Sequence, residues 1–394
     1  MRLRALCLVL VGGLLSPPLA AQAGRSSASL EELEARARAD SNDAVAHYRL
    51  ALGYWDKKRY DAAERALREA ITIAPQYAEA YLALSVLHIA RGEKYWKRRR
   101  TADPDATPDP ELESARLYRR AFLLNPLVPL GILSRVDRRN HAQEWNLATT
   151  IWWYSAFSEG IDAFRDGRYG LAYDRLQSIL RDKRAGPQGD RVPDEVRWYH
   201  GLSAAHLERY DQAIADIRLL LDRAVAAEAA DSLGFLPLGS NDYRYVLATV
   251  SFLAGRYDDA VAYYREALAH DVGLYVAHVQ LARIHERRQE WDLAIAERRR
   301  AIETNPDDPS LLLDLGGTLA LARRWEEARQ ALRQAAEANR RDPRIPYLLG
   351  LVALQVGDTA EARGAFTRFR AMAPSRFRAQ LAEVETRLQS LGGR

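Results

Sequence analysis

YVAHVQLARIHERRQEWDLAIAERRRAIETNPDD, residues 275–308, runs directly into PSLLLDLGGTLALARRWEEARQALRQAAEANRRD, residues 309–342. A small residue stands at the same place in each segment, Ala282 in the first and Gly316 in the second. The same spacing, one full segment, extends backwards to Ala248 and forwards to Gly350. Four segments in one register predict an array of repeated units rather than a single layered domain.

Small residues form three columns along the chain. The first column continues before the four contiguous segments, at Ala51, Ser85, Gly160 and Gly201. The second column stands twelve residues after the first, at Ala63, Ala172, Ala213, Ala260, Ala294, Ala328 and Ala362. The third column follows seven residues later, at Ala70, Ala121, Ala267, Ala301 and Ala335. Antiparallel helices approach to about 8–10 Å only where their contact residues are small. We therefore expect the first two columns on the two helices of a pair, and the third where one pair meets the next.

Aromatic residues and prolines mark the two ends of the second helix in each pair. One position early in that helix is aromatic, at Tyr60, Tyr169, Tyr210, Tyr257, Trp291 and Trp325. Several units close on a proline, at Pro75, Pro126, Pro306 and Pro374. Proline lacks a backbone N–H and clashes with the preceding helical turn, so it ends a helix.

These columns resemble the tetratricopeptide repeat family, and the resemblance covers nearly all of the chain after residue 23. It implies an all-α fold: a right-handed superhelical solenoid of about eight helix pairs with a C-terminal capping helix. Glu159 stands where the family has leucine, so the third unit departs most from the pattern. The units are expected to start near Ala44, Ala78, Trp153, Asp194, Asn241, Tyr275, Pro309 and Pro343.

The ends of the array and its interruptions complete the predicted organisation. A solenoid needs capping elements, because each end otherwise exposes an apolar face. We expect a short helix within residues 24–43 and a capping helix over 377–394, in which Phe377, Leu381, Val384 and Leu388 recur at helical spacing. The units occupy 44–126, 153–226 and 241–376, with insertions at 92–109, 127–152 and 227–240. Such insertions either form binding loops or act as neutral spacers.

The first 23 residues have the layout of a secretory signal peptide. Arg2 and Arg4 precede an apolar run from Ala5 to Leu15, and Ala21-Gln22-Ala23 offers a small-residue cleavage site. The run is too short to span a bilayer, which needs about 20 apolar residues. Cleavage after Ala23 would remove Cys7, the only cysteine, and two positive charges from a net charge of +4. We therefore expect a periplasmic or secreted protein without a transmembrane segment.

No group of residues in the sequence has the spacing of a catalytic, cofactor or metal site, so we expect no enzyme activity and no cofactor. His278 and His285 share a helix face, but they occupy positions where the family places packing aromatics. Acidic pairs such as Asp258-Asp259 stand at turns between helices, where carboxylates cap helices. Arginine runs such as Arg298-Arg299-Arg300 are scattered among acids, whereas nucleic-acid binding needs a concentrated basic face. We expect no nucleic-acid partner.

In the family, the inner face of the superhelix is lined by the first helix of each pair and receives ligands. The corresponding positions here are mostly aromatic, with a charged patch in the sixth unit at Arg283, Glu286 and Arg287. None of them matches the lysines, arginine and asparagines with which chaperone cofactors of the family hold a C-terminal carboxylate. The side chains either form an exposed groove or pack between adjacent helices. The predicted groove residues are Tyr48, Trp55, Tyr154, Phe157, Phe164, Trp198, Tyr245, Phe252, Arg283, Arg287 and Tyr347.

Three functions follow from these patterns. The first is a non-catalytic scaffold of the bacterial cell envelope that binds a partner protein or peptide in the aromatic groove. The second is a part of an envelope assembly or polysaccharide export machine. The third is a sugar-binding module that uses Trp145, Trp152 and Trp153, or an enzyme whose site lies in an insertion.

Overall fold

The computed structural model describes residues 28–91, 96, 109–128, 151–229 and 238–392, which contain 18 α-helices and no strand. The described chain divides into two compact units. The first comprises the residues up to Leu87 together with His285–Arg394, and the second comprises His88–Ile284. The boundaries fall inside two helices, so each unit begins or ends within a repeat. The expected signal peptide and most of the three insertions lie outside the described residues.

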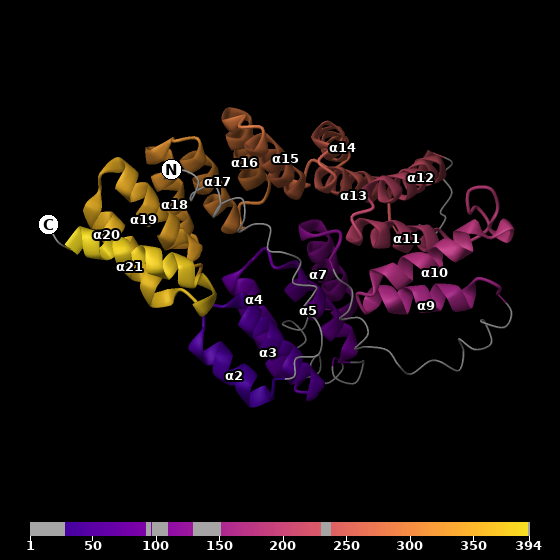
Figure 1. The fold of residues 1–394 in the computed structure, drawn as a ribbon, viewed down its shortest axis with the longest axis horizontal. Coiled ribbons are helices and arrows are strands. Elements are labelled where there is room, and N and C mark those ends of the chain that lie inside the picture. Colours follow the sequence, from indigo (N-terminus) through magenta and orange to yellow (C-terminus); the bar gives the residue numbers. More distant parts are fainter. Residues whose placement is uncertain (1–27, 92–95, 97–108, 129–150, 230–237, 393–394) are drawn as a thin grey trace. The chain divides into compact units, whose positions relative to one another are not determined.

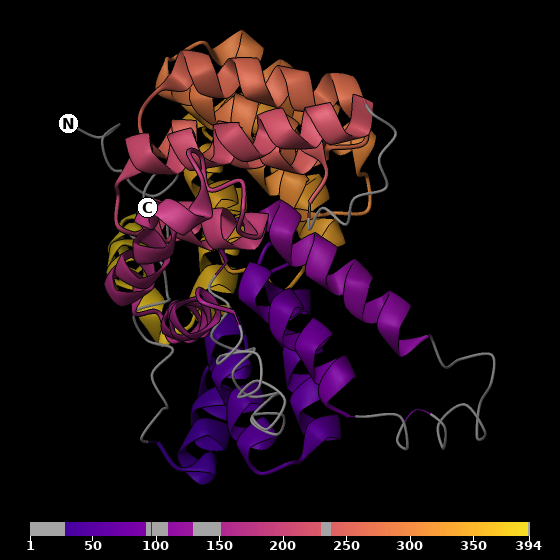
Figure 2. The same cartoon turned by 90° about the vertical axis from the view of Figure 1, so that its right-hand side faces the viewer.

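Consecutive helices within each unit pack in antiparallel pairs, as the columns predict (Figure 1, Figure 2). Each first helix begins within one residue of the start that the sequence indicates. The pairs that lie wholly within one unit are α3 (Ala44–Asp56) with α4 (Tyr60–Ile73), α9 (Tyr154–Arg165) with α10 (Tyr169–Arg181), α11 (Asp194–His206) with α12 (Tyr210–Ala229), α13 (Ser240–Leu253) with α14 (Tyr257–His270), α17 (Ser310–Leu321) with α18 (Trp325–Ala338), and α19 (Arg344–Val356) with α20 (Thr359–Met372). The second and sixth repeats supply four more helices: α5 (Ala78–Ala90), α7 (Pro110–Leu124), α15 (Tyr275–Arg287) and α16 (Trp291–Thr304).

Close approach within a pair depends on the first column of small residues. A Cβ atom added at Gly350 would lie 2.5 Å from Cε1 of Phe366 on the partner helix, and one added at Gly316 would lie 2.7 Å from Cγ of Leu332. Both partners are fully buried. The third pair, which departs most from the family pattern in sequence, uses the same contact between Gly160 and Leu176. Its unusual Glu159 is exposed and pairs with Arg175 at 2.9 Å.

A further column, sixteen residues after the first, supplies the side chain that fills each pair. All of its members are at most 2 % exposed. Six are apolar or aromatic and one is charged. They are Leu67, Leu176, Ile217, Tyr264, Arg298, Leu332 and Phe366. Arg298 is therefore the one described member of this core column that brings a charge into the array.

The turn between the two helices of a pair repeats the same backbone conformation. In the eighth pair, Gly357 has φ +82° and the next amide, of Asp358, donates to the carbonyl of Ala353 at 2.9 Å. In the seventh pair, Arg323 has φ +60° and the amide of Arg324 donates to Leu319 at 2.9 Å. This left-handed residue ends the first helix. The equivalent positions are Lys58, Gly167, Glu208, Gly255 and Gln289, all with positive φ.

Replacing Arg323 by glycine is expected to raise the free energy of unfolding by about 0.5–1 kcal/mol, because a residue with a Cβ is strained in the left-handed region and glycine is not. The matched control is Gly357→Ala in the next repeat, where an added Cβ meets no atom within 4 Å and only the backbone strain changes. This variant should lose a similar amount. Urea unfolding followed by circular dichroism measures both changes, and equal midpoints for the two variants would contradict the prediction.

The two end helices cover the apolar faces of the first and last pairs. Helix α2 (Leu30–Ala39) begins with a capping box between Ser29 and Glu32, and it buries Leu33 and Ala37. Helix α21 (Arg378–Gly392) buries Val384, while Phe377, Leu381 and Leu388 pack against the same core cluster. Helix α21 covers the face on which another repeat would otherwise pack, as the helical spacing of its apolar residues predicts.

Candidate functional site

The predicted groove residues divide into two groups by burial. Four of them are nearly inaccessible: Trp55, Phe164, Tyr245 and Tyr347, at 5 %, 1 %, 1 % and 3 % exposed. Of the others, Arg287 is exposed and six are half-buried: Tyr48, Tyr154, Phe157, Trp198, Phe252 and Arg283. The buried four pack inside the array and present almost no surface to a partner. The sequence alone leaves open whether such positions pack or face outward, and each alternative holds for part of the set.

Aromatic neighbours explain why these side chains are buried. Phe164 has Tyr169, Tyr199 and His206 around it, with ring centroids 5.3, 5.3 and 5.8 Å away. The Tyr347 ring lies 5.1 Å from that of Phe369, and its hydroxyl donates to Glu383 of the capping helix at 2.7 Å. Burial raises the pKa of Tyr347, and the hydrogen bond to Glu383 adds to this effect.

The half-buried aromatic residues form small clusters with neighbouring rings. Phe157 meets Trp153 edge to face at 5.7 Å, and Trp198 meets Tyr243 in the same way at 5.7 Å. In the first unit, Tyr48 lies 5.2 Å from Tyr77. Each ring is held by a partner and keeps part of its surface accessible. Rigid aromatic surface of this kind supplies much of the energy at protein interfaces.

The charged patch predicted in the sixth repeat rests on an ion network in the first unit. Arg298 pairs with Glu286 at 2.9 Å and with Asp314 at 3.0 Å, and its Nε also donates to Thr318 at 3.2 Å. The Thr318 hydroxyl donates to Glu286 at 2.5 Å. Burial lowers the pKa of Arg298, but the two carboxylates outweigh burial and the net shift is upward. The network joins the second helix of the sixth repeat to the first helix of the seventh.

Histidine side chains that could act as ligands or bases are engaged in packing. His285 is buried and its Nδ1 lies 2.5 Å from Glu290. His200 is buried with its Nδ1 2.6 Å from Asp216, and its ring stacks on Tyr173 at 4.3 Å. Within the described residues, no group of three or more histidine, cysteine, aspartate or glutamate side chains has a metal-binding arrangement.

His206 is a half-buried base that stacks on Tyr169 with ring centroids 3.9 Å apart. Burial lowers the pKa of His206 to about 4, and it raises the pKa of Tyr169 to about 12. In the unfolded chain, His206 has an ordinary pKa near 6.5 and binds a proton below that pH. Between about pH 6.5 and 4 the unfolded state therefore binds more protons, so stability present above pH 6.5 is lost as the pH falls.

We expect this histidine to cost the second unit about 2 kcal/mol of stability between pH 7.5 and pH 5.0. Replacing His206 by phenylalanine keeps a ring against Tyr169 and removes the titrating group. The loss on acidification should shrink by about that amount in His206→Phe. Urea midpoints at the two pH values measure the difference, and an equal fall in both proteins would exclude His206 as its source.

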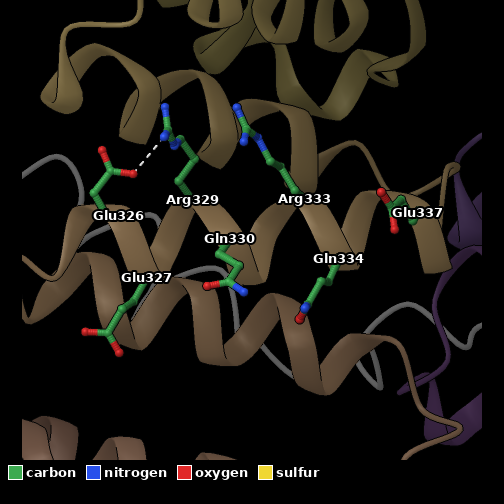
Figure 3. Close-up of a pocket in the computed structure, with 7 residues that line it drawn as sticks. All are labelled: Glu326, Glu327, Arg329, Gln330, Arg333, Gln334 and Glu337. Carbon is green, nitrogen blue, oxygen red and sulfur yellow. Dashed lines mark ion pairs between the residues drawn. The ribbon is translucent and has the colours of Figure 1, made fainter.

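The described surface also contains a shallow depression of about 400 Å³ on α18. Figure 3 shows its lining, which comes from a single helix: Glu326, Glu327, Arg329, Gln330, Arg333, Gln334 and Glu337. Arg329 pairs with Glu326 at 2.8 Å, and Arg333 pairs with Glu361 of α20 at 2.6 Å. These charges satisfy one another across neighbouring repeats. The depression is separate from the predicted groove, and its lining has no aromatic residue.

The three tryptophans considered for sugar binding have different surroundings. Trp145 lies outside the described residues. Trp152 is 36 % exposed and the Arg184 guanidinium lies 4.2 Å from its ring centroid. Trp153 packs on Phe157.

None of the helices in the described part of the chain has the length and apolar composition needed to span a membrane.

Family models of the tetratricopeptide repeat match three segments of the chain, residues 44–77, 290–352 and 347–390. No curated protein matches the sequence.

Several solved structures are similar over parts of the chain. MamA AMB-1 is 20 % identical, with 46 % of this chain and 94 % of that chain covered and a TM-score of 0.37. The C-terminal part of a repeat-containing protein from Cytophaga hutchinsonii is 14 % identical, covering 60 % and 92 %, with a TM-score of 0.46. A tetratricopeptide repeat protein from Parabacteroides merdae is 11 % identical, covering 61 % and 99 %, with a TM-score of 0.37. The family models thus identify tetratricopeptide repeats at residues 44–77 and 290–390, and the described helices between these segments pack in pairs with the same columns of small residues.

Proposed function

We propose that this protein is a non-catalytic scaffold of the bacterial cell envelope that binds a partner protein or peptide along the first helices of its repeats. Tetratricopeptide arrays are protein-interaction scaffolds in general. The observation that carries the proposal here is the series of half-buried aromatic side chains on successive first helices of the second unit. Phe157 lies on α9, Trp198 on α11 and Phe252 on α13.

The chemistry of these positions favours an apolar or amphipathic partner segment. Phe157, Trp198 and Phe252 each have a neighbouring ring within 6 Å, so they lose little further freedom on binding. The positions lack the basic side chains that would hold a free carboxylate. A surface of preorganised rings gains affinity mostly from apolar area removed from water.

Co-purification from envelope extract tests the proposal when the wild type is compared with Phe157→Ala/Trp198→Ala/Phe252→Ala. The matched control is Val272→Ala/Leu293→Ala, which removes apolar side chains that are 82 % and 53 % exposed on a turn and on the second helix α16. A partner recovered with the wild type and the control, but lost with the triple variant, supports the proposal. Equal recovery with the triple variant contradicts it.

The envelope location rests on the signal-like sequence of residues 1–23. Fractionation of cells that express the full chain, followed by the mass of the exported product, tests it. The expected product begins at Gly24. A product that keeps Met1 and stays in the cytosolic fraction would exclude the location and leave the binding proposal standing.

A further inference from the structure

Helix α7 contacts the first helices of two successive repeats within the second unit, α13 and α15. Phe122 of α7 meets Tyr245 of α13 edge to face, with ring centroids 6.2 Å apart. Burial raises the pKa of Tyr199 on α11, and the nearby Tyr118 of α7 adds to this shift. Arg120 donates to the hydroxyl of Tyr275 of α15. Helix α7 therefore packs across consecutive first helices in the same way that a helical ligand packs in a groove of its receptor.

Two adjacent arginines supply the charged part of this contact. Arg119 forms an ion pair with Asp242 of α13, and its guanidinium lies 5.5 Å from the centroid of Phe122. The Arg120 guanidinium lies 5.1 Å from the centroid of the Tyr275 ring. Cation–π contacts and a carboxylate together select arginine over lysine, because the planar guanidinium can stack and pair at once.

A hydrogen bond fixes the C-terminal end of α7 to the same face. The hydroxyl of Tyr245 donates to the carbonyl of Leu123 at 2.5 Å. Leu123 stands in the last turn of α7, where helix carbonyls have no partner within the helix. Tyr245 is 1 % exposed, so this predicted groove residue is already covered by the chain's own helix.

We propose that the face formed by α13 and α15 recognises a helical protein segment with two adjacent arginines and an aromatic residue two positions after the second arginine, and that α7 fills this place in the free protein. The proposal rests on the protein-binding function proposed above, and it names the chemistry of the partner. The partner segment competes with Arg119, Arg120 and Phe122 for Asp242, Tyr245 and Tyr275. Its apparent affinity is therefore reduced by the fraction of molecules in which α7 occupies the face.

A labelled peptide of residues 109–126, DPELESARLYRRAFLLNP, serves as the probe in fluorescence anisotropy. The full chain with Arg119→Ala/Arg120→Ala has a weakened internal occupant and an intact receiving face. It should bind the peptide about tenfold more tightly than the wild type does. Adding Asp242→Arg to that variant should abolish the gain, and a peptide with both arginines replaced by alanine should bind neither chain.

Equal peptide affinity in the wild type and the Arg119→Ala/Arg120→Ala variant would overturn the proposal, as would a gain that survives Asp242→Arg. Size-exclusion chromatography checks for exchange of α7 between two copies, and a gain confined to dimers would overturn it too. Hydrogen exchange in the milder variant Asp242→Asn gives a second reading. Amides 112–124 should exchange faster while amides 311–372 stay unchanged, and unchanged exchange at 112–124 contradicts the proposal.

These outcomes are separate from those of the co-purification test. Failure of the peptide to bind, together with partner loss in the Phe157/Trp198/Phe252 variant, rejects only the arginine-bearing segment. If the peptide binds but the Phe157/Trp198/Phe252 variant recovers the partner as well as the wild type does, only the proposed binding at the aromatic residues is rejected.

Discussion

Gly350→Val is expected to lower the free energy of unfolding by about 3 kcal/mol or more. The first added carbon would lie 2.5 Å from Phe366, and 2.6 and 2.9 Å from two further atoms of the same ring. Phe366 is fully buried in the cluster that joins the seventh and eighth repeats, so it has no free space to enter. The two helices of the eighth pair must move apart, and this would also disturb the packing of the capping helix.

Gly364→Val is the matched control, because Gly364 lies in the partner helix α20 and an added Cβ meets no atom within 4 Å. Valine has a slightly better helix propensity than glycine, so this variant should match the wild type or gain a few tenths of a kcal/mol. Combining Gly350→Val with Phe366→Ala should recover part of the loss, since it removes the colliding ring. Urea unfolding measures all three. A Gly350→Val protein as stable as the Gly364→Val protein would show that the pair does not depend on the small residue.

Much of the fold is predictable because the same packing contact recurs in successive repeats, so its sequence requirement appears at a regular spacing. Gly316 and Gly350 occur exactly one repeat apart at a contact that admits only a small side chain, and this spacing locates the helix pairs. The left-handed turn residue has a weaker signal. It is glycine at Gly255 and Gly357 but arginine at Arg323, because the strain of one residue is small beside the packing of a pair.

The candidate site is less predictable, because long-range contacts decide which groove residues remain accessible. Tyr245 is covered by α7, whose Leu123 belongs to the second repeat, far earlier in the chain. Tyr245 occupies a position in its repeat that could equally face an open groove. The repeat pattern alone therefore does not reveal that α7 buries this side chain. Within the described residues, the aromatic contacts of Phe157 and Trp198 include no such long-range cover, and both side chains are half-buried.

The buried arginine has a sequence signal that periodicity can reveal. Arg298 stands one repeat after Tyr264 and one repeat before Leu332, both fully buried. A charge in an otherwise apolar column predicts either an error of register or buried partners of opposite charge. The structure supplies the partners, Glu286 and Asp314. Replacement of Arg298 should therefore destabilise the first unit strongly.

Replacing Arg298 by leucine, the residue at the equivalent position 332, is expected to lower the free energy of unfolding by about 3–5 kcal/mol. Leucine suits the column in size and polarity, so the cost comes from the carboxylates left behind. Asp314 has a side chain only 4 % exposed and that of Glu286 is 13 % exposed. Without the guanidinium, each must stay charged in an apolar environment or take up a proton. Urea unfolding at pH 7.5 measures the loss, and Arg299→Leu on the exposed side of the same helix should change stability by less than about 0.5 kcal/mol.

The array itself indicates how to repair this variant. Ala320 and Leu348 stand one repeat after Glu286 and Asp314, and in their own repeats they belong to an apolar core. The triple variant Arg298→Leu/Glu286→Ala/Asp314→Leu therefore replaces the network by the packing of the neighbouring repeats. It should regain most of the lost stability, because a buried ion pair is worth little more than well-packed apolar residues of similar volume. A triple variant as unstable as Arg298→Leu alone would mean that the shape of the arginine side chain, rather than its charge, holds the sixth repeat to the seventh.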